Sequence, residues 1–390
     1  MQVVLFEDQV WSRFLPLAYT RPIGELRMGM MTQAQRYARV MNTEVAHSTR
    51  PYLRALFPEA HAQLQLHVNA RLFPSEPLLN ELKSMTPGDV LKSGDTMLAR
   101  CIDSLNEQPE RVWQSSAELI WIERITDLFS MNVMAMKFDF EHMPKTHGSQ
   151  SLHASNCVIG DASQLFVHEK ATVYASTLNT LDGPIYIDAD AEIMEGTHIR
   201  GGFYLGEHAT LKLGTKIYGA TTIGPQCKVG GEVSNSIFYG HSNKAHDGFV
   251  GNSLIGEWCN LGADTNTSNL KNNYSNVKIW SYAEADFADT GLTFCGLIMG
   301  DHSKCGINTM FNTGTVAGVN ANIYGGGFPD KHIPSFSWGG PEGWEVYDPE
   351  KAFGTIAKVM QRRGQTLTET MRTLLLHIFA ETAHHRNSAS

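Results

Sequence analysis

The stretch that decides the fold is residues 185–230, which read IYIDADAEIMEGTHIRGGFYLGEHATLKLGTKIYGATTIGPQCKVG. Aliphatic side chains recur at every sixth position: Ile187, Ile193, Ile199, Leu205, Leu211, Ile217, Ile223 and Val229. A second row, four residues after each of these, is mostly small: Ala191, Thr197, Phe203, Ala209, Thr215, Thr221, Cys227 and Val233. A fixed short period of this kind is typical of stacked coils, with both rows facing inward and tight corners between short strands. We therefore expect a left-handed parallel β-helix over about 185–323.

The six-residue register changes after residue 230. We expect it to break at Asn235 and to restart at Phe249, Ile255 and Leu261. It returns near the end of the repeat at Met299, Cys305, Phe311, Ala317 and Ile323. Because breaks in a solenoid are where loops leave the stack, two excursions are predicted, over 236–248 and 268–296.

Composition and charge exclude several classes of protein. A chain of 390 residues exceeds the size of one growing core, so two or three structural units are expected. A net charge of -9 without a basic stripe argues against a nucleic-acid partner. No window approaches the ~18 apolar residues of a membrane span, so no membrane partner is expected. The first residues lack a secretory signal pattern, which favours a cytoplasmic location.

The rest of the chain divides by its local patterns. An apolar strand at residues 3–6 and helix-like composition at 29–40 indicate an α/β unit before the repeat, and apolar residues at helical spacing over 124–141 indicate a connecting helix. Four segments are expected: an α/β unit over 1–105, a helical connector and linker over 106–150, the β-helix over 151–335, and a carboxyl-terminal extension over 336–390.

Two helices are predicted in the carboxyl-terminal extension. They cover 349–363, which begins after Asp348 and is stopped by Gly364, and 366–382. The second carries a run of apolar residues that needs a surface to cover. A subunit boundary is one candidate for that surface.

A resemblance narrows the function. Residues 246–269, HDGFVGNSLIGEWCNLGADTNTSN, contain every fixed position of H-x-x-x-[LV]-G-x-x-x-I-G-x-x-x-N-[IL]-G-A-x-T. This pattern resembles the acetyltransferase half of the bacterial bifunctional N-acetylglucosamine-1-phosphate uridyltransferase/glucosamine-1-phosphate acetyltransferase family. LPLAYTRPIGELRMGM at 15–30 and GLIMGDHSKCGINTMFNTGTV at 296–316 are similar to bacterial proteins described as sugar nucleotidyltransferases of this type. The resemblance implies a homotrimer and an acetyl-CoA co-substrate.

His246 is the candidate general base. An acceptor that attacks a thioester must lose a proton as the bond forms, and histidine titrates near neutral pH. In the resembling family the matching histidine lies on a loop at the seam between trimer subunits. A solvated surface histidine is the alternative interpretation.

The same resemblance implies further site residues. Gly262 and Ala263 match the segment that approaches the thioester, and Asn308, Thr309 and Gly325 match coils that line the acetyl-CoA cleft. Asn269 matches a sugar-contacting asparagine, although Leu270 replaces the tyrosine that follows it in the family. The candidate cations for a sugar phosphate are Lys244 and Lys271. Polar loop residues and ordinary coil positions remain the alternative for Asn269, Lys271, Asn308 and Thr309.

The amino-terminal unit looks like a reduced nucleotidyltransferase. The G-x-G-T-R turn expected after the first strand is absent, and only Thr20-Arg21-Pro22, with Arg27 beyond it, is similar to that motif. Asn69 stands where a Mg²⁺-binding aspartate is expected, so Mg²⁺ is implied only if this unit is active, and no metal ligand is predicted. Arg21 and Arg27 are candidate phosphate ligands. Pairing with Glu7, Asp8 or Glu25 is the alternative.

Three functions follow from these residues. The first is an acetyl-CoA-dependent acyltransferase acting on a sugar or sugar phosphate, with His246 as base at a trimer interface. The second is a sugar-1-phosphate nucleotidyltransferase whose β-helix mainly drives trimerisation. The third is a non-catalytic protein that binds a sugar nucleotide.

Overall fold

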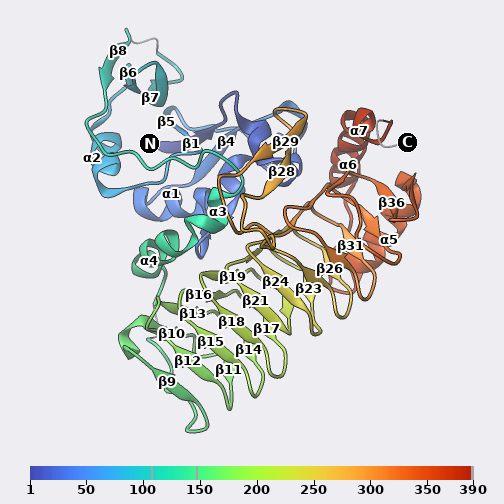
Figure 1. Cartoon of the computed structure of the whole chain (residues 1–390). Helices are drawn as coiled ribbons and strands as arrows, with labels where there is room; N and C mark the ends of the chain where they lie inside the picture. The colour runs from blue at the N-terminus through green and yellow to red at the C-terminus, as the bar shows by residue number, and fades with distance from the viewer. Residues whose placement is uncertain (107–108, 146–147, 388–390) are drawn as a thin grey trace.

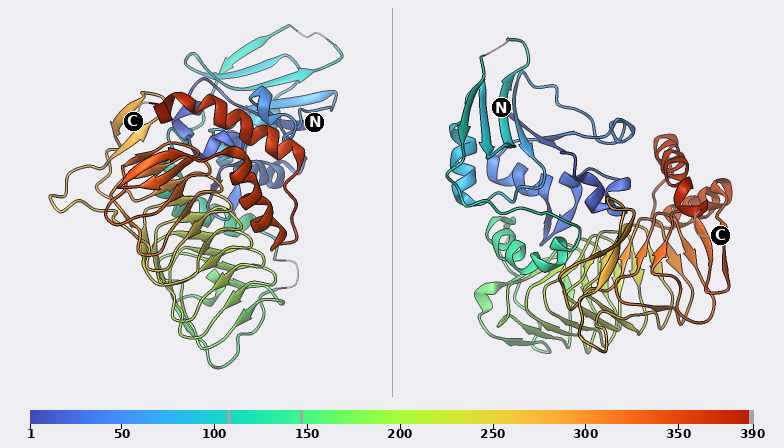
Figure 2. Two further views of the ribbon diagram at one scale, coloured as in Figure 1. Left: turned by 90° about the vertical axis from the view of Figure 1, so that its right-hand side faces the viewer. Right: turned by 45° about the horizontal axis from the view of Figure 1, so that its top comes forward.

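The computed structural model describes residues 1–106, 109–145 and 148–387 (Figure 1). The remaining residues, which include part of the predicted linker, lie outside the described ranges. An amino-terminal α/β unit and the carboxyl-terminal helices lie on the same side of a long parallel β-helix (Figure 2). No helix in the described ranges combines the length and the apolar composition needed to cross a membrane.

The amino-terminal unit is built on a mixed six-stranded sheet in the order β4-β1-β5-β7-β6-β8. The apolar strand β1 (Gln2–Phe6) is flanked by two parallel neighbours, β4 (Val45–Ser48) and β5 (Leu64–Asn69). The other strands are β6 (Asp89–Ser93), β7 (Thr96–Asp103) and β8 (Arg111–Gln114). Because β8 pairs with β6, the sheet continues past residue 105, where we placed the end of the unit.

Helices of this unit begin where the sequence supplies caps. Helix α1 (Gln33–Met41) opens with a capping box in which Thr32 and Gln35 exchange hydrogen bonds, so it begins later than the predicted residue 29. Helix α2 covers Glu76–Ser84. The predicted connecting helix is two helices in the structure, α3 (Asp127–Ser130) and α4 (Asn132–His142).

The β-helix has three parallel faces, confirming the fold inferred from the repeat. The first face contains β10 (Leu165–Val167), β13 (Ile185–Ile187), β16 (Phe203–Leu205), β19 (Thr221–Ile223), β22 (Ile237–Phe238), β25 (Leu254–Ile255), β30 (Ile298–Met299), β33 (Val316–Ala317) and β35 (His332–Ile333). The second contains β11 (Thr172–Val173), β14 (Glu192–Ile193), β17 (Thr210–Leu211), β20 (Lys228–Val229), β23 (Asn243–Lys244), β26 (Asn260–Leu261), β31 (Lys304–Cys305), β34 (Asn322–Ile323), β36 (Ser337–Gly340) and the antiparallel β37 (Gly343–Val346). The third contains β9 (Cys157–Ile159), β12 (Thr177–Asn179), β15 (His198–Arg200), β18 (Lys216–Tyr218), β21 (Glu232–Ser234) and β24 (Phe249–Gly251), followed by the pair β27 (Asn266–Thr267) and β32 (Met310–Phe311).

Successive members of the predicted aliphatic row fall on successive faces. Ile187, Ile193 and Ile199 lie on the first, second and third faces, and each is at most 1% exposed. The next coil repeats the order eighteen residues later, since Ile187 pairs with Leu205 and Ile193 with Leu211. Six residues therefore make up one strand of a coil together with the corner that follows it.

The six-residue register breaks near Asn235, as predicted, but no loop leaves the stack over 236–248, so the first predicted excursion is wrong. The stack continues through 236–248 with shortened coils, because Ile223 pairs with Phe238 and Val229 with Lys244. Two corners are shortened, because the inward residues Val229, Val233 and Phe238 are four and five positions apart instead of six. At the restart Val250 is buried in place of the predicted Phe249, whereas Ile255 and Leu261 lie inward as predicted.

The second predicted excursion, over 268–296, is present. It contains an antiparallel hairpin, β28 (Lys278–Ser281) and β29 (Asp286–Asp289), that reaches the amino-terminal unit (Figure 1). There the Tyr282 ring meets the edge of Tyr19, and Arg124 donates to the Thr290 carbonyl at 3.0 Å. The hairpin therefore ties the two units together.

The carboxyl-terminal helices start at the end of the β-helix and run back along it, where Arg363 donates to Gln226 and Asn243 of earlier coils (Figure 2). They are α5 (Pro349–Gln361), whose first turn is capped by Asp348, α6 (Glu369–Glu381) and the short α7 (Ala383–Asn387). Apolar residues of α6 join the core of the amino-terminal unit, and His377 stacks on Tyr52. The surface that α6 covers thus includes this chain's own amino-terminal unit.

The first face of the β-helix is apolar on its outside as well. Its outward residues Ile237, Leu254, Ile298 and Val316 are buried in one core with the amino-terminal unit. Burial of apolar area on this scale is the main force that fixes such a junction. The arrangement leaves the corner between the second and third faces uncovered.

Candidate functional site

The predicted acyl-transfer residues lie along the corner between the second and third faces, which we call the His246 edge. Two residues after β23, β26 and β34 stand His246, Ala263 and Gly325, and Asn308 follows β31 at the same corner. Backbone hydrogen bonds join these coils: Asp264 N–H donates to the Asp247 carbonyl at 3.0 Å, and Asn308 N–H to that of Ala263 at 2.8 Å. The structure thus brings these predicted residues together.

His246 presents a free imidazole at this edge. The residue is exposed, and its ring makes no hydrogen bond or ion pair with any residue of the described ranges. Its position between β23 and β24 follows from the shortened coil rather than from a loop that leaves the stack. A histidine without a partner on the chain is available to an incoming substrate.

Lys244 lies inside the β-helix and not on its surface. It occupies an inward position of the second face, aligned with Val229, and is 1% exposed. Its Nζ donates to the carbonyl of His246 at 2.8 Å and to that of Gly230 at 3.1 Å. Burial lowers the pKa of Lys244 to about 8. The prediction that Lys244 contacts a sugar phosphate is therefore wrong, because its ammonium group is buried and donates to backbone carbonyls.

The predicted cofactor residues differ in exposure. Asn308 and Gly325 are exposed at the corner, whereas Thr309 is buried and donates to the Gly306 carbonyl at 2.9 Å. Gly262 allows two coils to approach closely, since a Cβ there would lie 2.3 Å from the Gly306 carbonyl oxygen. Thr309 therefore fits the alternative interpretation, a satisfied coil position.

Asn269 and Lys271 lie elsewhere, at the start of the hairpin excursion. Asn269 donates to the Asn252 side chain at 2.8 Å, and Asn252 follows β24 whereas His246 precedes it. Lys271 donates to the Asn276 carbonyl at 2.6 Å. In this chain the width of the third face separates them from the His246 edge.

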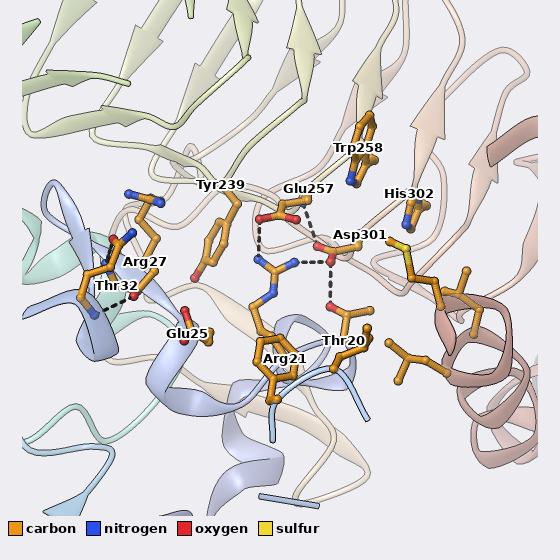
Figure 3. A pocket seen from close by; sticks show the side chains of 16 residues that line it. Thr20, Arg21, Glu25, Arg27, Thr32, Tyr239, Glu257, Trp258, Asp301 and His302 are labelled. Carbon is orange, nitrogen blue, oxygen red and sulfur yellow. Dashed lines mark hydrogen bonds and ion pairs between the residues drawn. The ribbon is translucent and has the colours of Figure 1, made fainter. Parts of the chain in front are cut away.

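A second site lies where the amino-terminal unit, the β-helix and α6 meet (Figure 3). This junction cavity has a volume of about 370 Å³. Its polar lining comes from both units and includes Arg21, Glu25, Arg27, Glu257, Asp301 and His302. Sequence reasoning found the two arginines but not the β-helix residues, because nothing in a sequence links Arg21 to a residue 280 positions away.

Arg21 forms its ion pairs with the β-helix, although its Nε has no hydrogen-bond partner in the described residues. Its guanidinium pairs with Asp301 and lies 3.4 Å from a Glu257 oxygen, and Thr20 Oγ1 donates to Asp301 at 2.7 Å. The sequence suggested that Arg21 binds phosphate or pairs with Glu7, Asp8 or Glu25. In the structure its ion-pair partners are instead Asp301 and Glu257. Burial lowers the pKa of neighbouring His302 to about 3, so that this imidazole is neutral near pH 7.

Arg27 has no such partner. It is 8% exposed, and its one hydrogen bond in the described residues runs from Nη1 to the Met30 carbonyl at 2.8 Å. No carboxylate of those residues lies within ion-pair distance of its guanidinium. Arg27 is therefore a nearly buried cation without an ion pair in the described residues, and its positive charge acts on Glu257 from a longer distance.

The ends of the amino-terminal strands hold a cluster that satisfies itself. Asp8, after β1, accepts from Asn69 at 3.0 Å and from Arg71 at 2.7 Å, and Arg71 also reaches Glu123 at 2.8 Å. Burial alone would raise the pKa of Asp8, but the bonds from Arg71 and Asn69 leave it below its usual value. Within the described ranges, metal-ligand geometry occurs instead at Asp190, Glu207 and His208, which are exposed on the β-helix.

The chain is similar to sugar nucleotidyl transferases and to bifunctional proteins that act on sugar phosphates. Residues 3–147 match a family model described as sugar nucleotidyl transferase. A bifunctional sugar-1-phosphate nucleotidylyltransferase/acetyltransferase of Sulfurisphaera tokodaii is 30% identical over 155 residues, 39% of this chain and 38% of that protein. A bifunctional protein GlmU of Methanocaldococcus jannaschii is 36% identical over 104 residues, 27% of this chain and 25% of that protein. The chain thus spans well under half of each relative.

The solved structures that align with this chain are only distantly similar to it. A UDP-N-acetylglucosamine acyltransferase of Arabidopsis aligns with 61% of this chain and 94% of its own, at 12% identity and a TM-score of 0.23. The polysialic acid O-acetyltransferase OatWY aligns with 49% of this chain and 84% of its own, at 12% identity and a TM-score of 0.21. Residues 3–147 thus resemble sugar nucleotidyl transferases, and part of the chain is similar in sequence to bifunctional sugar-1-phosphate nucleotidylyltransferase/acetyltransferases.

Proposed function

We propose that this chain is an acetyl-CoA-dependent acyltransferase that acts on a sugar or sugar phosphate. One observation carries the proposal: His246, Ala263, Asn308 and Gly325, distant in the sequence, lie along one exposed edge of the β-helix. The relatives named as acetyltransferases supply the reaction class.

His246 is proposed as the general base. Its free imidazole would accept the proton that an amine or hydroxyl loses as it attacks the thioester carbonyl, and the thiolate of CoA would leave. The developing oxyanion requires fixed donors. The N–H of Ala263 donates to no backbone carbonyl of the described residues, so it is available at the same edge.

A homotrimer is proposed because one copy supplies only one wall of a cleft. The His246 edge is a convex corner, and large apolar side chains stand exposed along it, including Leu213 at 67% and Ile307 at 70%. A second copy packed there would bury these side chains and enclose the thioester. Sedimentation equilibrium checks this directly: a mass three times that of the chain is expected, and a monomer at micromolar concentration contradicts the trimer.

The acyl-transfer test uses the purified full chain with acetyl-CoA and a panel of amino sugars and sugar phosphates. His246→Ala should lower kcat at least about 100-fold, the usual range for loss of a general base. His198→Ala is the matched control, since His198 is also exposed on the β-helix, on the third face. Full turnover in His246→Ala would remove this residue from the mechanism.

A sugar-1-phosphate nucleotidyltransferase is the second candidate, favoured by the family match of residues 3–147. Asp8 and Asn69 stand at the strand ends where Mg²⁺ and a nucleoside triphosphate would bind, but Arg71 already pairs with Asp8. Stabilisation by a nucleoside triphosphate with Mg²⁺, and none by acetyl-CoA, would favour this candidate over the first.

A further inference from the structure

We propose that Lys244 is a positioning residue for His246, whose main chain it fixes at the exposed edge of the β-helix. The inference rests on the proposed function, because it gives Lys244 a task in the acyl transfer assigned to His246. Lys244 touches no substrate in this role. Its side chain is 1% exposed and acts through the backbone of its neighbour.

The position of Lys244 is one that the β-helix otherwise fills with aliphatic side chains. Lys244 is aligned with Val229 of the preceding coil, and Val229 with Leu211, both 0% exposed. An ammonium group among such residues loses its water, which is costly. A well-packed apolar side chain there would stabilise the coil at least as well. Packing of the interior therefore does not explain why a lysine occupies this position.

The ammonium group joins two consecutive coils at the corner that carries His246. Its Nζ donates to the carbonyl of Gly230 at 3.1 Å and to that of His246, one coil further, at 2.8 Å. Gly231 leaves room for this group, since a Cβ there would lie 2.9 Å from Nζ. Hydrogen bonds from a charged donor are stronger than those from a neutral one. The main chain of His246 is thus held while its imidazole stays free.

The charged and titratable groups that act on the ammonium come from three coils. Asp247 follows His246, Asp264 lies at the same corner of the next coil, and Cys305 is on the inward row of β31. Burial lowers the pKa of Lys244 to about 8, although the two carboxylates oppose this shift. The group is therefore an ammonium below about pH 8 and a neutral amine, a weaker donor, above it.

The pH dependence of acyl transfer by the full chain tests this role. In wild type kcat should fall above about pH 8, where the ammonium loses its proton. Lys244→Met, which fills similar space without a donor, should lower kcat about tenfold at neutral pH and show no such fall. The KM for acetyl-CoA should change less than about twofold, because Lys244 contacts no substrate. An unchanged kcat and pH profile in Lys244→Met would overturn the proposal.

The wild-type profile covers the case in which Lys244→Met does not fold, which urea unfolding detects. A kcat that stays constant in wild type from about pH 7 to 10 would by itself contradict a role for the ammonium.

Lys304→Met is the matched control. Lys304 lies on the same face, burial lowers its pKa to about 8, and its Nζ donates to the His302 carbonyl at 2.7 Å. That bond is made at the corner before β31, whereas the His246 edge follows the strands of this face. Lys304→Met should keep the wild-type kcat and its fall above about pH 8. A loss equal to that of Lys244→Met would show that the effect is not specific to the His246 corner.

A spectroscopic readout separates this inference from the proposed function. In protein containing isotope-labelled histidine, the nuclear magnetic resonance signal of His246 is the one missing from His246→Ala. It should shift or broaden in Lys244→Met, while the signal of the exposed His198 stays unchanged. If wild type transfers no acetyl group but the spectra change in this way, acyl transfer fails and the positioning of His246 stands. Identical spectra of wild type and Lys244→Met would exclude the positioning role.

Discussion

The polar side chains of the strand-end cluster in the amino-terminal unit bind one another, whereas the imidazole at the His246 edge has no partner in the described residues. Asp8, Asn69 and Arg71 bind one another, so each side chain has a partner within the fold. His246 has none in the described residues, and Lys244 holds the backbone beneath it. Polar groups that bind one another stabilise the unit that contains them. An imidazole without a partner contributes little to folding and remains free to react.

This difference changes what each part of the chain is expected to tolerate. Substitution in the amino-terminal unit should appear as lost stability, because a removed partner leaves a buried charge behind. Substitution of His246 should appear as lost activity. Four substitutions, with decreasing expected effects on the free energy of unfolding, distinguish these two outcomes.

Asp139→Asn should have the largest effect. Asp139 and Arg36 are both 0% exposed, and Asp139 also accepts from the N–H groups of Met30 and Met31 at 2.8 and 3.1 Å. Removing its charge leaves Arg36 buried and unpaired, at a cost of about 3 to 5 kcal/mol. Urea unfolding measures the loss, with the exposed Glu141→Gln on the same helix as control. A change below about 1 kcal/mol would show that this pair does not hold the unit.

Arg71→Met should destabilise less, by about 2 to 3 kcal/mol, because Asp8 keeps a side-chain exposure of 22% and the bond from Asn69. The surface variant Arg13→Met is the control, since Arg13 is 49% exposed. If Arg71→Met had the same free energy of unfolding as this control, the cluster would not stabilise the amino-terminal unit. The strand ends would then resemble an open binding site.

The sequence predicted the β-helix well because inward aliphatic residues repeat at strict spacing, and any other fold would expose them. It failed at Lys244 because a shortened coil places a lysine on the inward row, and no six-residue count anticipates that shift. It failed at the junction cavity for a different reason. Arg27 looks like any other arginine until the fold buries it and brings Asp301 to Arg21 instead.

Lys244→Met tests the buried lysine beneath the edge through pH. The folded pKa of about 8 lies below the ordinary value of 10.5, so the unfolded chain binds more protons between these pH values and stability rises with pH there. Wild type should therefore gain on the order of 2 kcal/mol relative to Lys244→Met between pH 8 and 10. Urea unfolding across this range gives the difference directly. Parallel stability curves for the two proteins would mean that the ammonium is as well solvated in the fold as in the unfolded chain.

His246→Ala should have the smallest effect on stability, within about 0.5 kcal/mol, because an exposed side chain without a partner in the described residues loses little on truncation. The same variant should show the largest loss of acyl transfer. Unchanged stability together with lost activity is expected of a reactive group and not of a structural one. Measuring unfolding and turnover on one preparation keeps the two readouts comparable. If stability and activity fell together, as expected for Asp139→Asn, His246 would have a structural role, and the contrast between the two regions would not hold.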